Sequence, residues 1–398
     1  DAETAARELD LVRTGRNVGK NQRVPMAGVP HHAAEGLIAK LLAKGYKVAL
    51  CEQIGSETVN GVMPRDVTRV FTAGTVIEPG MLDAGRNNYL VAVIIDEERA
   101  GLAYVDITTG QFATTQLADR RSLLEELVRL APAELLLADN EQWLAGQSIR
   151  IPAVSRLPNW RFEEETSRRT LLDHFGVTTL AGFGCEGKPL ASRAAGAILT
   201  YLQETQKRAV AQIQGLATYS TNGFMALDAA SRRNLELTES LTGGQDNALL
   251  GVLDKTITPM GKRLLRDRVT RPLLDVPAIE ERLDQVEAFF NEGLLRAEVR
   301  AMLKGLPDLE RLTNRAVSGS ASPRDLDNIG KVLAIVPRLK ALLVGQPLEG
   351  EPALDGQQPL TSLQTLAGRL DPCLETAQLI EQAIVEDAPN NLNKMGVV

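Results

Sequence analysis

The spacing of apolar residues changes along this chain, and each kind of spacing predicts a different kind of core. YLVAVIID, AGLAYVDIT and QFATTQ, within residues 89–116, are short apolar runs separated by the turn sequences DEER and TG. Short strands joined by tight turns form an antiparallel meander. Beyond about residue 225 the apolar residues recur every three or four positions, as in Ile279, Leu283, Val286 and Phe290 and again in Leu326, Ile329, Leu333 and Val336. That spacing predicts helices that each bury one stripe against their neighbours.

Further local signals divide the chain into parts. SLLEELVRL predicts a helix after the meander, AELLLA a continuous apolar strand, and ASRAAGAILTYLQETQ a later helix. Asp275 and Ser322 are predicted helix caps because a proline closely follows each of them, and Pro337 is expected to bend or break its helix. YKVALCEQI and DVTRVFTAGTVI predict strands, whereas RTGRNVGKNQR, residues 13–23, has no apolar period and predicts a loop.

The expected fold class is therefore multi-domain, α/β followed by all-α. Residues 1–80 are predicted to form a small mixed α/β domain, and residues 81–88, which include the polar run DAGRNN, a linker. Residues 89–215 are predicted to form an α/β domain and residues 216–398 a helical bundle with long, lever-like helices. Since 398 residues exceed the length of one ordinary domain, this division agrees with the length of the chain.

Composition is typical of a globular protein from a reducing compartment. Hydrophobic residues make up 44% of the chain and charged residues 24%, and no apolar run approaches the roughly 20 residues that cross a bilayer. Cys51, Cys185 and Cys373 are scattered without a CxxC pair, so we expect free, buried thiols and a cytoplasmic protein. The sequence starts at Asp1 with neither an initiator methionine nor a signal peptide, which predicts a piece of a longer protein.

Charge is distributed unevenly in a way that favours the first part as a site for a polyanion. The formal net charge is -7, but residues 1–80 hold ten basic and nine acidic residues, a net of +1, so the remaining residues carry -8. Residues 13–23 contain no acid, two glycines and four cations, Arg13, Arg16, Lys20 and Arg23. Such a segment suits contacts with phosphates, and a flexible, solvated loop is the alternative.

A second basic cluster lies in GKRLLRDRVTR, a predicted helix. Its cations are Lys262, Arg263, Arg266, Arg268 and Arg271. Charges on a helix usually form a solvated face or pair with neighbouring helices, and we favour that structural interpretation here.

The adjacent histidines His31 and His32 raise the question of a metal site. Neighbouring residues on a helix point about 100 degrees apart, so the two rings do not readily face one ion. A metal site in addition needs three or four ligands. Because Pro30 precedes them and apolar residues at helical spacing follow, the histidines are predicted to begin a helix.

A nuclease is the main catalytic alternative. Three meandering strands followed by a helix and another strand resemble the start of a ribonuclease-H-like fold, whose nucleases gather carboxylates around magnesium. Asp96, Asp106 and Asp139 are the candidate ligands, but the centre of the first strand, Val91-Ala92-Val93, carries no carboxylate. A structural domain is therefore the favoured interpretation. No GxxxxGK[ST] phosphate loop and no GxSxG elbow occur in the sequence, so these residues predict no ATPase site and no catalytic site.

Several long segments, taken in order, resemble the MutS family of DNA mismatch-recognition proteins. They are VPMAGVPHHAAEGLIAKLLAKGYKVALCEQIG, RDVTRVFTAGTV, YLVAVIIDEERAGLAYVDITTGQF, ALDAASRRNLELTESL, TGGQDNALLGVLDKTITPMGKRLLRDRVTRPL and PDLERLTNRAVSGSASPRDL. The resemblance covers nearly the whole chain. It implies a mismatch-binding domain, a ribonuclease-H-like connector without nuclease activity, and a helical core that leads into a lever.

The same resemblance implies how the whole protein works. Family members bind mispaired or looped double-stranded DNA, dimerise, hydrolyse ATP with magnesium through an ABC-type domain, and signal to a downstream repair protein of the MutL type. We therefore expect a homodimer associated with the nucleoid. The clamp, the ATPase domain and the family's Phe-x-Glu wedge do not occur in these residues, and the wedge is expected upstream of Asp1.

The resemblance also implies roles for individual residues. Arg16 matches a basic residue that approaches DNA, Met26 lies in the PMAG turn near the duplex, and Arg69 matches an arginine that contacts the DNA backbone. Together with Arg13, Lys20 and Arg23 they form the expected DNA-binding set. The chain departs from the family pattern at Ala73, where TPGT is usual, at Gly15-Arg16, where a basic pair is usual, and in the tail NNLNKMGVV.

Two other functions stay open from the sequence. One is a metal-dependent nuclease built on the α/β domain. The other is an assembly scaffold of the same family that does not read mismatches.

Overall fold

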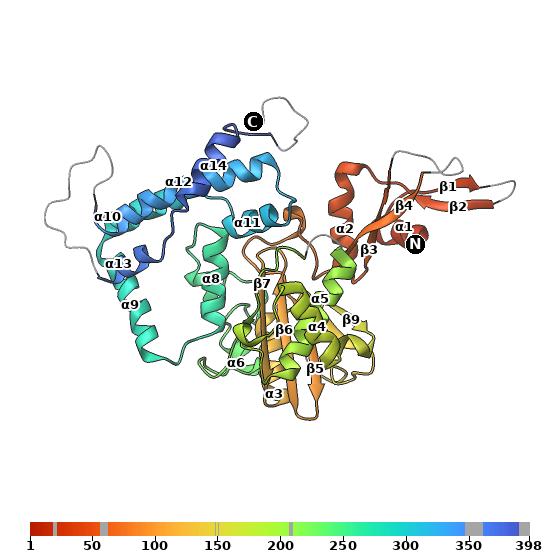
Figure 1. Ribbon diagram of the computed structural model, residues 1–398, viewed down its shortest axis with the longest axis horizontal. Helices are drawn as coiled ribbons and strands as arrows, with labels where there is room; N and C mark the ends of the chain where they lie inside the picture. The colour runs from red at the N-terminus through yellow and green to blue at the C-terminus, as the bar shows by residue number, and fades with distance from the viewer. Residues whose placement is uncertain are drawn as a thin grey trace. The chain divides into compact units, whose positions relative to one another are not determined.

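The computed structural model describes residues 1–18, 22–55, 63–147, 149, 151–206, 210–346 and 361–389. The chain divides into two compact units, Asp1–Tyr219 and Ser220–Val398. Figure 1 labels their helices and strands. Within the described residues, no helix is both long enough and apolar enough to cross a membrane.

The first 80 residues of the first unit hold two small antiparallel sheets. Strand β1 pairs with β2, and β3 pairs with β4 through a register shift at Leu50 and Cys51. The elements are α1 (Ala2–Leu9), β1 (Arg13–Val18), β2 (Gln22–Ala27), η1 (His31–Ala33), α2 (Ala34–Ala43), β3 (Val48–Gln53), β4 (Arg65–Phe71) and η2 (Pro79–Met81). A small apolar core is centred on Leu42, Phe71 and Val76.

The predicted loop at residues 13–23 is wrong, because most of this segment belongs to the hairpin β1–β2. The described side chains of this hairpin are exposed or, at Gly15 and Ala27, half-buried. Neither face is buried, so the strands carry no alternation of apolar and polar residues that the sequence could reveal. The strands predicted around residues 46–54 and 66–77 are confirmed as β3 and β4, and the second of them ends at Phe71.

The rest of the first unit is built around a six-stranded sheet of described strands with the order β10-β7-β6-β5-β8-β9. Strands β5, β6 and β7 form the predicted antiparallel meander, and β8, β9 and β10 each join the sheet in parallel. The elements are β5 (Leu90–Asp96), β6 (Arg99–Asp106), β7 (Gln111–Leu117), α3 (Arg120–Leu130), β8 (Glu134–Ala138), β9 (Ala153–Leu157), η3 (Asn159–Phe162), α4 (Glu164–Phe175), η4 (Ala181–Phe183), α5 (Pro189–Gln206) and β10 (Ala217–Thr218). The helices and the strand predicted after the meander are confirmed as α3, β8 and α5.

Helices cover both faces of this sheet (Figure 1). Successive strand residues point to opposite faces, so Leu90 and Ala92 join the core beneath α4 and α5, whereas Val91 and Val93 join the core beneath α3. Each of these four side chains is fully buried. Burial of a leucine or valine stabilises a fold by about 1.5–3 kcal/mol, and the alternation explains why β5 is apolar along its whole length.

The second unit is helical in its described part. Its helices are α6 (Ala229–Asn234), α7 (Leu249–Leu253), α8 (Pro259–Thr270), α9 (Val276–Asn291), α10 (Gly293–Leu303), α11 (Leu309–Val317), α12 (Pro323–Leu343), α13 (Thr361–Gly368) and α14 (Leu374–Ala383). Asp275 accepts a hydrogen bond from the Ala278 amide, and Ser322 forms a capping box with Asp325, so both predicted caps are confirmed. The sequence predicts that Pro337 bends or breaks its helix, and α12 continues through it unbroken.

The two apolar stripes predicted in the helical unit have different outcomes. On α12, Ile329 and Leu333 are buried against Leu312 of α11, as predicted. On α9, Leu283, Val286 and Phe290 are 59%, 64% and 78% exposed, so the prediction that this stripe is buried is wrong for the described chain. Helical spacing identifies the apolar face of a helix, but whether a neighbour covers that face depends on tertiary packing.

Candidate nucleic-acid interface

The hairpin β1–β2 separates the predicted DNA-binding residues onto two faces. Directly paired residues of an antiparallel pair share a face, and pairing alternates the faces along the strands. Arg13 pairs with Ala27, and Asn17 with Arg23, so both arginines lie on the first face. The Arg13 guanidinium also forms an exposed ion pair with Glu3 of α1 at 3.1 Å, which shows that this face is the one near α1.

Gly15 allows the side chain of Arg23 to cross the hairpin on that face. A Cβ atom built at Gly15 would lie 2.6 Å from Nε and 3.0 Å from Cγ of Arg23. Any side chain at this position would therefore displace the arginine. Gly15 is one of the positions at which this chain departs from the usual family pattern, and the geometry links that departure to the placement of Arg23.

The opposite face of the hairpin joins a cation to apolar side chains. Arg16 pairs with Val24, and Thr14 pairs with Met26, so all four share this face. Arg16 is exposed, and Val24 and Met26 are 46% and 45% exposed. An arginine beside exposed apolar groups on a two-stranded ribbon can contact a phosphate and, at the same time, pack against sugars or base edges in a groove. Lys20, the remaining member of the predicted segment, lies outside the described residues.

Arg69 of β4 lies in a different environment. Its side chain is 16% exposed and forms an ion pair with Glu78. Its Nε donates to Oε1 of Gln206 on α5 at 2.9 Å, its Nη2 donates to the Thr75 carbonyl at 3.3 Å, and its guanidinium lies 4.3 Å from the centre of the Phe71 ring. These partners all belong to the chain itself, and contact of Arg69 with DNA stays a prediction.

The histidines begin a helix, as predicted. His31 and His32 occupy the single 3₁₀ turn that leads into α2, and both side chains are exposed. Among the described residues, no group of three or more histidine, cysteine, aspartate or glutamate side chains is placed to hold a metal ion.

The prediction of buried cysteines is only partly right. All three thiols are free, but Cys51 and Cys373 are exposed and only Cys185 is buried. Burial raises the pKa of the Cys185 thiol, which favours the protonated form over the reactive thiolate. Cys51 lies on β3, whose residues are mostly exposed, and an apolar sequence pattern alone could not show that the strand is covered on neither face.

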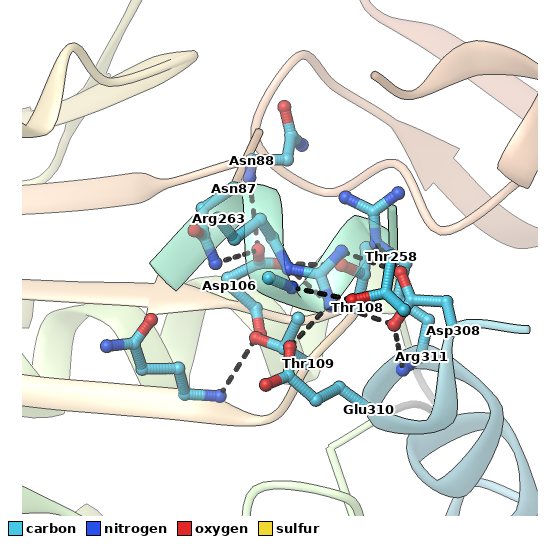
Figure 2. Close-up of polar contacts among 12 residues, drawn as sticks. Asn87, Asn88, Asp106, Thr108, Thr109, Thr258, Arg263, Asp308, Glu310 and Arg311 are labelled. Carbon is cyan, nitrogen blue, oxygen red and sulfur yellow. Dashed lines mark hydrogen bonds and ion pairs between the residues drawn. The ribbon is translucent and has the colours of Figure 1, made fainter. Parts of the chain in front are cut away.

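The carboxylate of Asp106, a candidate nuclease ligand, accepts hydrogen bonds from residues of its own chain at both oxygens. It is fully buried, and Figure 2 shows it among Asn87, Asn88 and Thr108. Its Oδ1 accepts from the Thr108 amide at 2.9 Å and the Thr108 hydroxyl at 2.6 Å, and its Oδ2 accepts from the Asn87 side chain at 2.9 Å and the Asn88 amide at 3.1 Å. The four bonds hold the end of the predicted linker against β6. Asp106 thus has a structural role. The sequence suggests it only as a candidate metal ligand.

The other two nuclease candidates are surface residues. Asp96 lies at the end of β5 and pairs with Arg99 at 3.3 Å, and Asp139 is exposed after β8. A fully buried, hydrogen-bonded aspartate and two exposed ones do not form the shared carboxylate cluster that metal-dependent cleavage requires.

The second basic cluster contains the cross-helix pair that its helical position predicted. Arg263 on α8 has a side chain only 4% exposed and donates to both oxygens of Asp308, at 2.6 and 2.8 Å, and to Glu310 at 2.5 Å (Figure 2). Burial lowers the pKa of Arg263, but the hydrogen bonds to the two carboxylates outweigh it and raise that pKa above its ordinary value. This arginine therefore links α8 to α11 inside the helical unit.

Three family models match the chain in consecutive blocks. The model described as MutS domain I matches residues 1–79, the model described as MutS domain II matches residues 88–214, and the model described as MutS domain III matches residues 230–398.

Three relatives align with the whole chain. DNA mismatch repair protein MutS of Symbiobacterium thermophilum is 43% identical over 411 residues, that of Halothermothrix orenii 40% over 405, and that of Trichormus variabilis 41% over 416. All of this chain is covered in each comparison, but only 45%, 44% and 47% of the respective relatives. The chain therefore spans less than half the length of these relatives.

Proposed function

Because this chain belongs to the MutS family of DNA mismatch repair proteins, we propose that it recognises mispaired or looped double-stranded DNA. The observation that carries the proposal is the hairpin β1–β2, which lies in the block matched by MutS domain I and exposes Arg16 and Met26 on one face. The only block of the chain with a net positive charge contains this hairpin.

The proposed recognition combines charge contacts with DNA deformation. Arg16 contacts a phosphate, and Val24 and Met26 pack against the opened groove. Arg13 and Arg23, on the other face of the hairpin, extend the positive potential toward neighbouring phosphates. A mispair stacks poorly, so it bends at a lower cost than a matched pair, and that difference supplies selectivity at positions that no side chain reads.

We assign the remaining parts from the same family relation. Residues 1–80 form the mismatch-binding domain, 81–88 a linker, 89–215 the connector, and 216–398 the helical core with the start of a lever. A ribonuclease-H-like connector is supported by the strand order β7-β6-β5-β8-β9, in which three antiparallel strands precede two parallel ones. No observation favours the nuclease alternative, since Asp106 is occupied by its own chain.

The whole protein is proposed to pass the recognition signal to an ATPase domain. These 398 residues contain no phosphate loop, and ATP and magnesium are proposed only for the whole protein. A homodimer, a MutL-type downstream protein and association with the nucleoid complete the proposal, and each rests on the family relation alone.

The test compares Arg16→Ala with a charge-matched control. Both variants are made in the 398-residue chain and titrated with matched and G·T-containing duplexes at two salt concentrations. Arg121→Ala is the control, because Arg121 is a 79% exposed arginine of α3 outside the hairpin. Loss of one phosphate contact should weaken binding to both duplexes. It should also reduce the salt slope, which is the slope of the logarithm of the binding constant against the logarithm of the salt concentration, by about 1 in magnitude. The control should match the parent. Equal binding and an equal slope for Arg16→Ala would refute the assignment of the hairpin.

A further inference from the structure

A buried carboxylate joins the first 80 residues to the connector. Glu134, the first residue of β8, is fully buried. Its Oε2 accepts hydrogen bonds from the Thr72 hydroxyl and, at 2.9 Å, from the Gly74 amide, both in the turn that follows β4. Its Oε1 accepts from Ser155 of β9 at 2.5 Å and from Tyr201 of α5 at 2.7 Å. Each oxygen thus serves a different part of the unit.

The turn that bonds Glu134 packs closely against the connector sheet. The Thr72 amide donates to the Thr75 hydroxyl at 3.1 Å, and both threonines are buried. A Cβ atom built at Gly74 would lie 2.9 Å from Cβ of Glu134 and 2.9 Å from Cδ1 of Leu90. Only glycine lets the turn approach this closely, since any side chain there would push the turn away from the sheet.

A second contact connects the same two parts at the end of α5. Gln206 is buried, its Nε2 donates to the Val70 carbonyl at 3.1 Å, and its Oε1 accepts from Arg69 at 2.9 Å. Tyr201 and Gln206 both belong to the last turns of α5, the helix that packs along the connector sheet. Helix α5 therefore bonds β4 directly through Gln206 and reaches the turn after β4 indirectly, through Tyr201 and Glu134.

The hydrogen bonds to Glu134 fix the position of the turn more strictly than an apolar contact would. A buried carboxylate is tolerated only when its oxygens are satisfied, and donors left unpaired in a buried site are costly. An apolar contact could slide by an ångström with little loss, whereas four hydrogen bonds to one carboxylate fix both distance and orientation.

The geometry points to Glu134 as a positioning residue that holds the DNA-binding domain in a fixed orientation on the connector. A displacement of β4 that accompanies DNA binding then reaches α5 directly at Gln206 and, through Glu134, at Tyr201. This inference rests on the proposed function, because it requires that residues 1–80 bind DNA. It gives Arg69 a role in the same junction, through Gln206, instead of a direct contact with phosphate.

Hydrogen exchange of the DNA-free chain tests the junction itself. Glu134→Gln keeps one acceptor oxygen, and Gly74→Ala leaves the carboxylate intact but crowds the turn. Glu126→Gln is the matched control, since Glu126 is another buried carboxylate, paired with Arg129 on the α3 side of the sheet. We expect amides of β3 and β4 to exchange at least tenfold faster in both junction variants, with β5–β7 unchanged, and no change in β3 and β4 for the control. Unchanged exchange in β3 and β4, or an equal increase across β5–β7, would overturn the proposal.

Duplex titration then separates positioning from DNA contact. Both junction variants should bind the G·T duplex threefold to tenfold more weakly than the parent but with the parent's salt slope, because the number of phosphate contacts is unchanged. A changed slope would mean that the substitution alters the number of phosphate contacts, and it would overturn a role limited to positioning. If the parent chain binds no duplex, the proposed function fails, while the exchange experiment still decides whether Glu134 holds the two parts together.

Discussion

At the scale of single residues, the partners of a charged side chain decide its role. Arg16 and Arg69 both lie in strands of the first 80 residues, and the family relation predicts DNA contact for both. Arg16 is exposed on the hairpin, whereas Arg69 is held by Glu78, Gln206 and the Thr75 carbonyl. An exposed arginine can meet a phosphate without losing a partner, but a mostly buried one must first break its internal bonds.

Asp308 supports a prediction about pH at the same scale. Burial alone would raise the pKa of its carboxyl, but hydrogen bonds from Arg263 outweigh burial and lower that pKa below its ordinary value. Asp308→Asn should destabilise the chain by about 1–3 kcal/mol near neutral pH, because it leaves a buried arginine without its full charge partner. The asparagine can still accept the hydrogen bond from the Arg311 amide that caps α11, so the substitution tests the effect of the negative charge alone.

The sign of the pH dependence follows from the lowered pKa. A carboxyl whose native pKa is below its unfolded value, about 3.9, stabilises the fold above that pH and loses this effect as pH falls through the native pKa. The stability difference between parent and Asp308→Asn, measured by urea denaturation, should be constant from about pH 5 to 8 and should shrink below about pH 4. A difference that grows toward acid pH would contradict the ion pair.

At the scale of elements, helix α12 shows how a local signal can set where a helix begins. The Ser322 hydroxyl accepts from the Asp325 amide at 3.2 Å, and the Asp325 carboxylate accepts from the Ser322 amide at 2.9 Å. Ser322→Ala removes one half of this capping box and should cost about 1 kcal/mol in the free energy of unfolding. Ser320→Ala, a nearby exposed hydroxyl outside the helix, should cost much less, and equal effects in urea denaturation would contradict the cap.

At the scale of the whole molecule, the first unit ends at an anchored residue. The Tyr219 amide donates to the Thr114 carbonyl at 3.0 Å, the Thr115 hydroxyl donates to the Tyr219 carbonyl at 2.8 Å, and the Tyr219 hydroxyl donates to Glu126 at 2.8 Å. A chain ending at Tyr219 should therefore fold by itself, with one cooperative thermal transition and slow exchange in β5–β7. A chain ending at Leu216 lacks β10 and this anchor and should unfold at a lower temperature. An unfolded 1–219 chain would show that the unit depends on the helical part.

The sequence alone determined the elements whose side chains face a core in a regular way. The meander and β8 follow from short apolar runs bounded by turn residues, α3 and α5 from helical spacing, and the caps of α9 and α12 from local hydrogen-bonding chemistry. These signals lie within a few positions of one another, so no distant contact is needed to read them. The family resemblance added the proposed roles of Arg16 and Met26, which periodicity could not supply.

Only the tertiary structure decided which surfaces are covered and where polar groups find partners. The stripe of α9 is exposed, and the hairpin β1–β2 shows no apolar alternation because it buries neither face. Glu134 lies in AELLLA, a run predicted as an apolar strand, and its four hydrogen bonds come from residues 21 to 67 positions away. A local pattern carries no record of donors that distant, because folding alone brings them to one carboxylate, and the cost of burying that carboxylate unpaired is what keeps them there.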